Sequence, residues 1–213
     1  DWSSDVCSSD LGNCTSGNAD VRHYFTANMV FNTPKFANRT LNMLAGGWQI
    51  APILQLKSGN FLTITSGTDR ALTTASGQTA NQVLGDVYAT DKGKPCANVS
   101  PCVNYLNKAA FQIPALGTYG TMRYGTVQGP GLIQLNTAIS RTFNVGEKRT
   151  LQLRGEAFNV PNHLNPLIPA ANLNVNSALF GLATADQSGI AGQVGGVTSG
   201  DYRVIQLALK LVF

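Results

Sequence analysis

The last twelve residues of the chain, 202–213, set the strongest limit on its fold. Large apolar side chains alternate there with smaller or polar ones at a period of two residues. Neighbouring side chains of a β-strand point to opposite faces of the sheet, so one face of this segment is apolar. The pattern fits a strand that faces hydrocarbon, and the alternative is a last strand packed on a soluble core. The apolar row consists of Ile205, Leu207, Leu209, Leu211 and Phe213.

The composition is consistent with a protein that crosses a membrane with β-strands. Charged residues make up 12% of the chain, which is about half the share usual in soluble domains. No apolar run is long enough for a transmembrane helix, whereas alternation conceals the hydrophobicity of a transmembrane strand. Lys and Arg are scattered rather than gathered in a basic stripe, so we expect no nucleic-acid partner.

Four earlier segments show the same alternation, and each has about ten to thirteen residues, enough to cross the hydrocarbon at a tilt of about 45°. Pro52 lies inside one of them, where a missing N–H is awkward for a central strand, and it is predicted to mark a bulge. The segments are 22–31, 48–58, 131–143 and 150–160.

The connections alternate between short (32–47, 144–149) and long (59–130, 161–201). Outer-membrane barrels have short periplasmic turns and long external loops. We therefore expect an all-β fold, namely about five C-terminal antiparallel strands of a large transmembrane β-barrel. Five strands cannot close a ring, and no open edge can face lipid, so the chain is expected to be an incomplete fragment. Its first and last strands would pair with strands outside this sequence.

The beginning of the chain has a different character. Residues 1–11 read like a translated sequencing adapter, so we treat them as an artefact and leave them out of the fold prediction. Residues 12–20 would then be the remnant of a truncated loop, and 21–213 the barrel part.

Two cysteines, Cys96 and Cys102, lie close together in the turn-rich part of the long segment 59–130. A disulfide between them is expected, and it would place this loop in an oxidising space. A metal site would need further ligands, and the histidines, His23 and His163, are distant in the sequence. Cys14 has no evident partner.

No arrangement of residues in the sequence indicates catalysis, so we expect neither an enzyme nor a bound cofactor. Arg154 and Glu156 share the polar face of segment 150–160, and Lys210 lies on the polar face of the last strand. These charges are expected to face the barrel lumen. Arg154 and Glu156 would either meet the material that fills the lumen or serve as a structural pair that holds strand geometry.

Several segments together resemble the C-terminal barrel region of TonB-dependent outer-membrane receptors, in particular the Oar-like group. The resemblance covers about residues 21–213 and rests on the order and spacing of its motifs. Gln128 and Leu164 depart from it, because the family usually has Arg and often has Pro at these places. The motifs are Leu-Ala-Gly-Gly-Trp-Gln-Ile at 44–50, Leu-Lys-Ser-Gly at 56–59, Gln-Gly-Pro-Gly at 128–131, Leu-Gln-Leu-Arg-Gly-Glu-Ala-Phe-Asn at 151–159, Asn-His at 162–163, and the closing strand 206–213.

The resemblance implies a plugged barrel of about 22 strands in the outer membrane of a Gram-negative bacterium, which imports a scarce nutrient. The implied partners are outer-membrane lipid, the missing N-terminal strands and plug, an inner-membrane energy-coupling complex, an unidentified nutrient, and the barrel-assembly machinery. The closing row Ile205, Leu207, Leu209, Leu211 and Phe213 would be the signal for that machinery. One alternative is an outer-membrane adhesion or structural barrel that moves no substrate; another is a soluble secreted β-sandwich.

Overall fold

The computed structural model describes residues 21–75, 77–96, 102–145, 149–167, 174–186 and 203–213. The chain divides into two compact units. The strand unit comprises Tyr24–Lys57, Ile133–Leu164 and Asp201–Phe213. The loop unit comprises Asp1–His23, Ser58–Leu132 and Asn165–Gly200.

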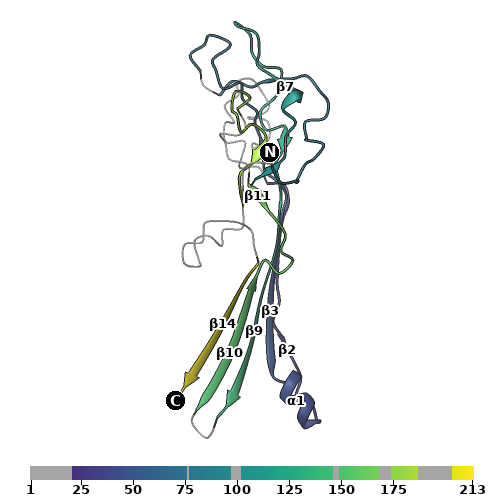
Figure 1. The fold of residues 1–213 in the computed structure, drawn as a ribbon, viewed down its shortest axis with the longest axis vertical. Coiled ribbons are helices and arrows are strands. Elements are labelled where there is room, and N and C mark those ends of the chain that lie inside the picture. Colours follow the sequence, from purple (N-terminus) through teal and green to yellow (C-terminus); the bar gives the residue numbers. More distant parts are fainter. Residues whose placement is uncertain (1–20, 76, 97–101, 146–148, 168–173, 187–202) are drawn as a thin grey trace, which may run out of the picture. The chain divides into compact units, whose positions relative to one another are not determined.

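The strand unit is one six-stranded sheet in the order β1-β3-β9-β10-β14, with the short β2 also paired to β3 (Figure 1). The pairs β1–β3, β2–β3, β9–β10 and β10–β14 are antiparallel. Among the described residues β1 and β14 lie at the two ends of this order, so the sheet is open. The strands are β1 Tyr24–Asn28, β2 Phe31–Asn32, β3 Trp48–Lys57, β9 Leu132–Asn144, β10 Thr150–Phe158 and β14 Val204–Val212.

The single strand expected over 22–31 is divided into β1 and β2, and Pro52 explains the division. Tyr24 pairs with Lys57 in β1, and Phe31 pairs with Ile50 in β2, which is the same register on both sides of the break. Met29 N donates to Pro52 O at 3.1 Å, but Pro52 has no N–H to return a bond. Toward β1 and β2 the predicted bulge is therefore wrong: this ladder loses a hydrogen bond at Pro52 without gaining an extra residue.

The connection 32–47 contains a helix that the sequence reading did not include, α1 Arg39–Ala45. Asn38 is its N-cap, because its side chain accepts hydrogen bonds from Thr40 N at 3.0 Å and Leu41 N at 3.3 Å. Figure 1 shows α1 and the C-terminus at the same end of the strands.

The loop unit is built from short elements. Its strands form four two-residue antiparallel pairs, β4–β8, β5–β7, β6–β12 and β11–β13. The elements are β4 Phe61–Leu62, β5 Asn81–Gln82, β6 Val103–Asn104, the 3₁₀ helix η1 Lys108–Ala110, β7 Phe111–Gln112, β8 Val127–Gln128, β11 Pro166–Leu167, β12 Leu182–Ala183 and β13 Ala185–Asp186.

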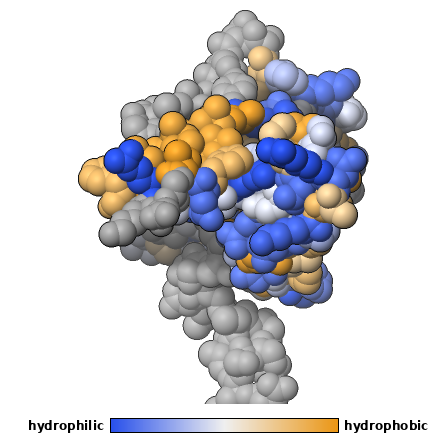
Figure 2. All heavy atoms as spheres, turned by 90° about the horizontal axis from the view of Figure 1, so that it is seen from below, coloured by the Kyte–Doolittle hydropathy of each residue, from blue (hydrophilic) through white to orange (hydrophobic). Residues whose placement is uncertain are grey.

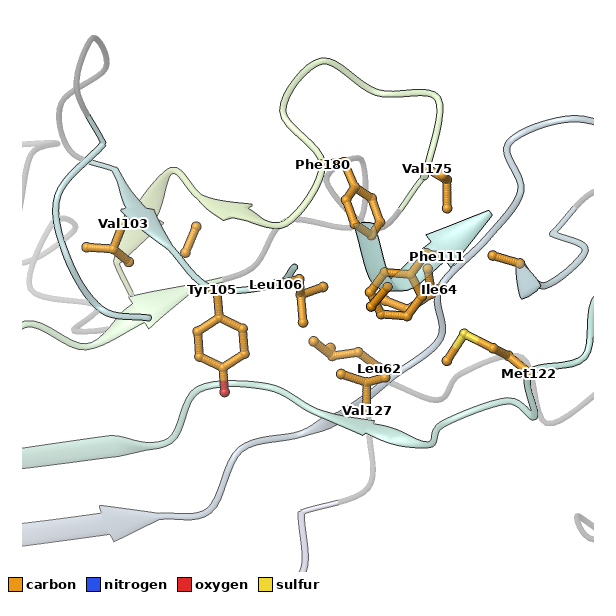
Figure 3. Close-up of a cluster of buried hydrophobic side chains, with 13 residues drawn as sticks. Leu62, Ile64, Val103, Tyr105, Leu106, Phe111, Met122, Val127, Val175 and Phe180 are labelled. Carbon is orange, nitrogen blue, oxygen red and sulfur yellow. The ribbon is translucent and has the colours of Figure 1, made fainter. Parts of the chain in front are cut away.

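The loop unit also has its own hydrophobic core, although the sequence suggested long polar loops (Figure 3). Ile64 is fully buried, and the rings of Phe111 and Phe180 meet edge to face with centroids 5.4 Å apart. The two long segments 59–130 and 161–201 thus contribute to one packed core. That core comprises Leu62, Ile64, Ala80, Val103, Tyr105, Leu106, Ala110, Phe111, Met122, Val127, Val175, Phe180 and Ala183.

Candidate functional site

The apolar row of β14 is exposed along its whole length. Leu207 is 81% exposed and Leu209 is 69% exposed, values far from those of a packed core. The register places this row next to alternate residues of β10, and these residues lie next to alternate residues of β9. Leu209 lies opposite Leu153, and Gly155 lies between Leu207 and Ile139. Figure 2 shows hydrophobic residues gathered in one continuous patch beside a hydrophilic area. An uncovered apolar face of this kind favours contact with hydrocarbon over the soluble-core alternative.

The opposite face of the same strands is polar. Arg154 Nε donates to Glu156 Oε1 at 2.8 Å, and its Nη2 lies 2.5 Å from the same oxygen. Gln206 pairs with Glu156 across β10 and β14, and Ala208 pairs with Arg154. These four residues border a shallow hollow on the sheet. The polar face of β10 therefore carries one partly exposed ion pair, Arg154–Glu156.

Lys210 lies on this polar face as well. It pairs with Gln152, which is the next residue on the same face of β10 after Arg154. The structure therefore brings Arg154 and Glu156 into contact and places Lys210 on the same side, outside the ion pair. Whether these three side chains face a water-filled lumen in the assembled barrel stays a prediction.

Cys96 and Cys102 form a disulfide in the loop unit, with their Cα atoms 5.4 Å apart. Cys96 N also donates to Cys102 O at 3.0 Å, and Asn104 N donates to Lys94 O at 3.0 Å, so a short ladder flanks the bond. The cross-link therefore closes a small loop at the edge of β6. Cys14 and residues 1–20 as a whole lie outside the described residues.

A cluster of two tyrosines and a lysine in the loop unit was not foreseen from the sequence. The Tyr88 and Tyr105 rings meet edge to face at 5.7 Å, and both hydroxyls donate to Gln128 O at 3.1 Å. Lys92 Nζ lies 3.8 Å from one ring centroid and 4.4 Å from the other. The shared acceptor joins Tyr88, before β6, and Tyr105, directly after β6, to β8, and the cation–π contacts hold Lys92 against both rings.

Burial governs the titration of this cluster. Burial raises the pKa of Tyr88 and, more strongly, the pKa of Tyr105. The neighbouring Tyr88 raises the pKa of Tyr105 further. Burial also lowers the pKa of Lys92, an effect that Asp86 opposes. All three groups are therefore held toward their neutral forms. The sequence carried no periodic signal for this cluster, since its members come from separate turns.

The Asn-His motif at 162–163 forms a turn at the end of β10, where Asn159 is the organising residue. Asn159 is fully buried with a φ of 48°, and its side chain both accepts from His163 N at 3.0 Å and donates to His163 O at 2.9 Å. Asn162 Oδ1 accepts from Arg203 N at 2.9 Å just before β14. The motif therefore has a turn-forming role in which the backbone of His163 takes part.

Within the described ranges, no group of three or more His, Cys, Asp or Glu residues could hold a metal ion. In the part of the chain that the structure describes, no helix is long and apolar enough to cross a membrane.

An antiparallel sheet with one exposed apolar face and one charged face defines the wall of a membrane β-barrel. The comparison with protein families agrees: the sequence matches the family described as "Outer membrane beta barrel domain" over residues 7–206. The chain belongs to this family, and it is therefore an outer-membrane barrel protein of a Gram-negative bacterium. Neither a curated protein nor a solved structure matches it.

Proposed function

We propose that the chain is the C-terminal part of a TonB-dependent receptor of the Oar-like group, which takes up a scarce nutrient with energy passed from the inner membrane. It would act as a transporter and not as an enzyme. The observation that carries the proposal is the sheet itself. Its apolar face suits lipid, and its polar face bears the Arg154–Glu156 pair, as expected for a barrel wall around a filled lumen.

The motifs quoted above add the finer assignment, because they follow the order seen in Oar-like receptors. In this proposal the polar face of β10 and β14 meets the plug, which would lie N-terminal to this chain together with the remaining strands. The Arg154–Glu156 pair would form part of that contact. The loop unit would lie on the cell exterior, where a packed core and a disulfide would give a nutrient-binding surface a fixed shape.

Assembly would use the closing strand. Its exposed row ends in Phe213, which is 92% exposed, and we propose that the barrel-assembly machinery recognises this row before β14 pairs with the first barrel strand. The row consists of Ile205, Leu207, Leu209, Leu211 and Phe213.

The test is made on the complete gene in its bacterium. A deletion strain is grown under limitation of one nutrient at a time, and it is complemented with the intact gene or with a gene lacking the N-terminal energy-coupling segment. We expect a growth defect for one nutrient that only the intact gene repairs. Transport would be contradicted if the gene without that segment restored growth fully. It would also be contradicted if the deletion strain grew normally but lost surface attachment, and this result would favour the adhesion alternative.

A further inference from the structure

Helix α1 is attached to the lipid-facing side of the sheet. Arg141 of β9 occupies the same face as Ile139 and Phe143, the alternate positions that continue the apolar side. Its guanidinium donates to Asn42 O at 3.1 Å and to Met43 O, both in the last turn of α1. A charged residue on the apolar side of β9 is thus used to hold the helix.

Aromatic rings complete this attachment. The Arg141 guanidinium carbon lies 4.6 Å from the ring centroid of Phe143 and 5.6 Å from that of Trp48. Trp48 Nε1 donates in turn to Leu44 O at 2.9 Å. Side chains from β3 and β9 therefore satisfy the carbonyls of Met43 and Leu44 in the last turn of α1, while Asn42 O also accepts the helical hydrogen bond of Gly46 N. Such pairing matters most where water is scarce.

The apolar side chains of α1 are left uncovered in the strand unit. Leu41 is 47% exposed, Met43 is 63% exposed and Leu44 is 66% exposed. Arg39 and Lys35 are also exposed and add positive charge at the start of the helix. A short helix with bulky apolar residues and adjacent cations has the composition of an interfacial membrane helix.

The position of α1 along the strands fixes the leaflet. It lies at the end where β9 joins β10 through the short connection 145–149, and short turns of outer-membrane barrels are periplasmic. A charge on the lipid face is strongly unfavourable at the bilayer midplane and is tolerated near the boundary, so Arg141 indicates that this level of β9 lies near the headgroups.

We propose that α1, held by Trp48 and Arg141, is an interfacial anchor that lies in the headgroup region of the periplasmic leaflet. Its apolar residues enter the acyl boundary, and Lys35 and Arg39 contact anionic phospholipid headgroups. The occupant is a lipid surface, because the helix continues the lipid-facing side of the sheet and its charges are cationic. The proposal requires only the outer-membrane barrel and not the transport activity.

The test uses the full-length protein in phosphatidylethanolamine vesicles with and without phosphatidylglycerol. Cysteines other than Cys96 and Cys102 are replaced by serine, and a nitroxide label is placed at Met43→Cys or, as a control on the polar face of β3, at Gln49→Cys. We expect the Met43 label to collide more often with oxygen, which partitions into lipid, than with an aqueous nickel complex, and the Gln49 label to show the reverse. Phosphatidylglycerol should deepen the Met43 label, and Lys35→Gln with Arg39→Gln should abolish that change.

Two results would overturn the anchor. A Met43 label that is open to nickel would place α1 in water, and a label shielded from both reagents would place it against a protein partner. A lipid-buried label that ignores phosphatidylglycerol would refute the anionic-headgroup contact.

Discussion

Leu209 of β14 lies directly opposite Leu153 of β10, and both side chains belong to the apolar face of the sheet. One residue earlier, Ala208 lies opposite Arg154 on the polar face. A single step along β14 therefore separates a site that suits hydrocarbon from one beside a guanidinium. This relationship allows the two faces to be tested separately within one strand.

Leu209→Arg is expected to destabilise the barrel. The residue is near the middle of β14, so an arginine there would be placed close to the bilayer midplane, at a cost of about 2–4 kcal/mol. The measurement is urea-induced unfolding of the full-length protein in lipid vesicles, with the free energy of unfolding compared between variant and wild type.

The matched control is Gln206→Arg, because Gln206 pairs with Glu156 on the polar face. An arginine there gains an opposite charge across the strands and should change the free energy of unfolding by less than about 1 kcal/mol. Ala208 is a poorer choice, since an arginine at that position would face Arg154. Equal losses at 206 and 209 would contradict the assignment of the faces.

Asn159→Ala should loosen the turn after β10. Alanine removes both side-chain hydrogen bonds to the backbone of His163, which should lower the free energy of unfolding by about 1–3 kcal/mol. Alanine also disfavours the left-handed backbone conformation of residue 159. Asn159→Gly accepts that conformation but still lacks the hydrogen bonds, so its loss should be smaller. Unfolding free energies of the three proteins give the comparison, and an alanine variant as stable as wild type would rule out this role.

The strands and their faces could be predicted from the sequence because the period-2 alternation persists over whole strands. In β10 and β14 it correctly assigned residues as distant as Leu153 and Leu209 to one face. The same reasoning placed Arg154 and Glu156 together, and the structure joins them in an ion pair.

The features that were missed lack such a repeat. Helix α1 has only seven residues, so its apolar spacing covers too few turns to be distinguished from a loop. The core of the loop unit draws Ile64, Phe111 and Phe180 from separate short segments, and single apolar residues in polar stretches carry no periodic signal. These contacts are set by tertiary packing and not by local pattern.

Removing the disulfide should loosen the loop unit locally. Cys96→Ser with Cys102→Ser opens a loop whose ends are 6 residues apart, and the lost constraint on the unfolded chain is worth about 2 kcal/mol. Hydrogen exchange should show faster exchange at the amide of Asn104, which donates to Lys94 O. Reduced wild-type protein should behave like the double variant, and unchanged exchange in both would show that the bond does not support this ladder.

Alkaline pH should weaken the loop unit through Tyr88 and Tyr105. Both phenols have a pKa raised by burial, so the folded state favours their neutral forms. Their contribution to stability is complete below the unfolded tyrosine pKa of about 10 and is lost as the pH rises through the higher folded values. Lys92, whose pKa is lowered, changes in the opposite sense, because its desolvation cost falls as it loses its proton. Tyr105 has the large pKa shift of the three groups, so the net effect is a loss.

The measurement is the urea midpoint for unfolding of the loop unit in the full-length protein, monitored by hydrogen exchange. It is compared at about pH 8 and about pH 11. The control is Tyr88→Phe with Tyr105→Phe, which keeps both rings beside Lys92 but removes the hydroxyls that donate to Gln128 O. This variant should be less stable at the lower pH, by about 1 kcal/mol for each hydrogen bond, and should lose most of the further decrease at the higher pH. An equal decrease in variant and wild type would assign the alkaline sensitivity to other groups.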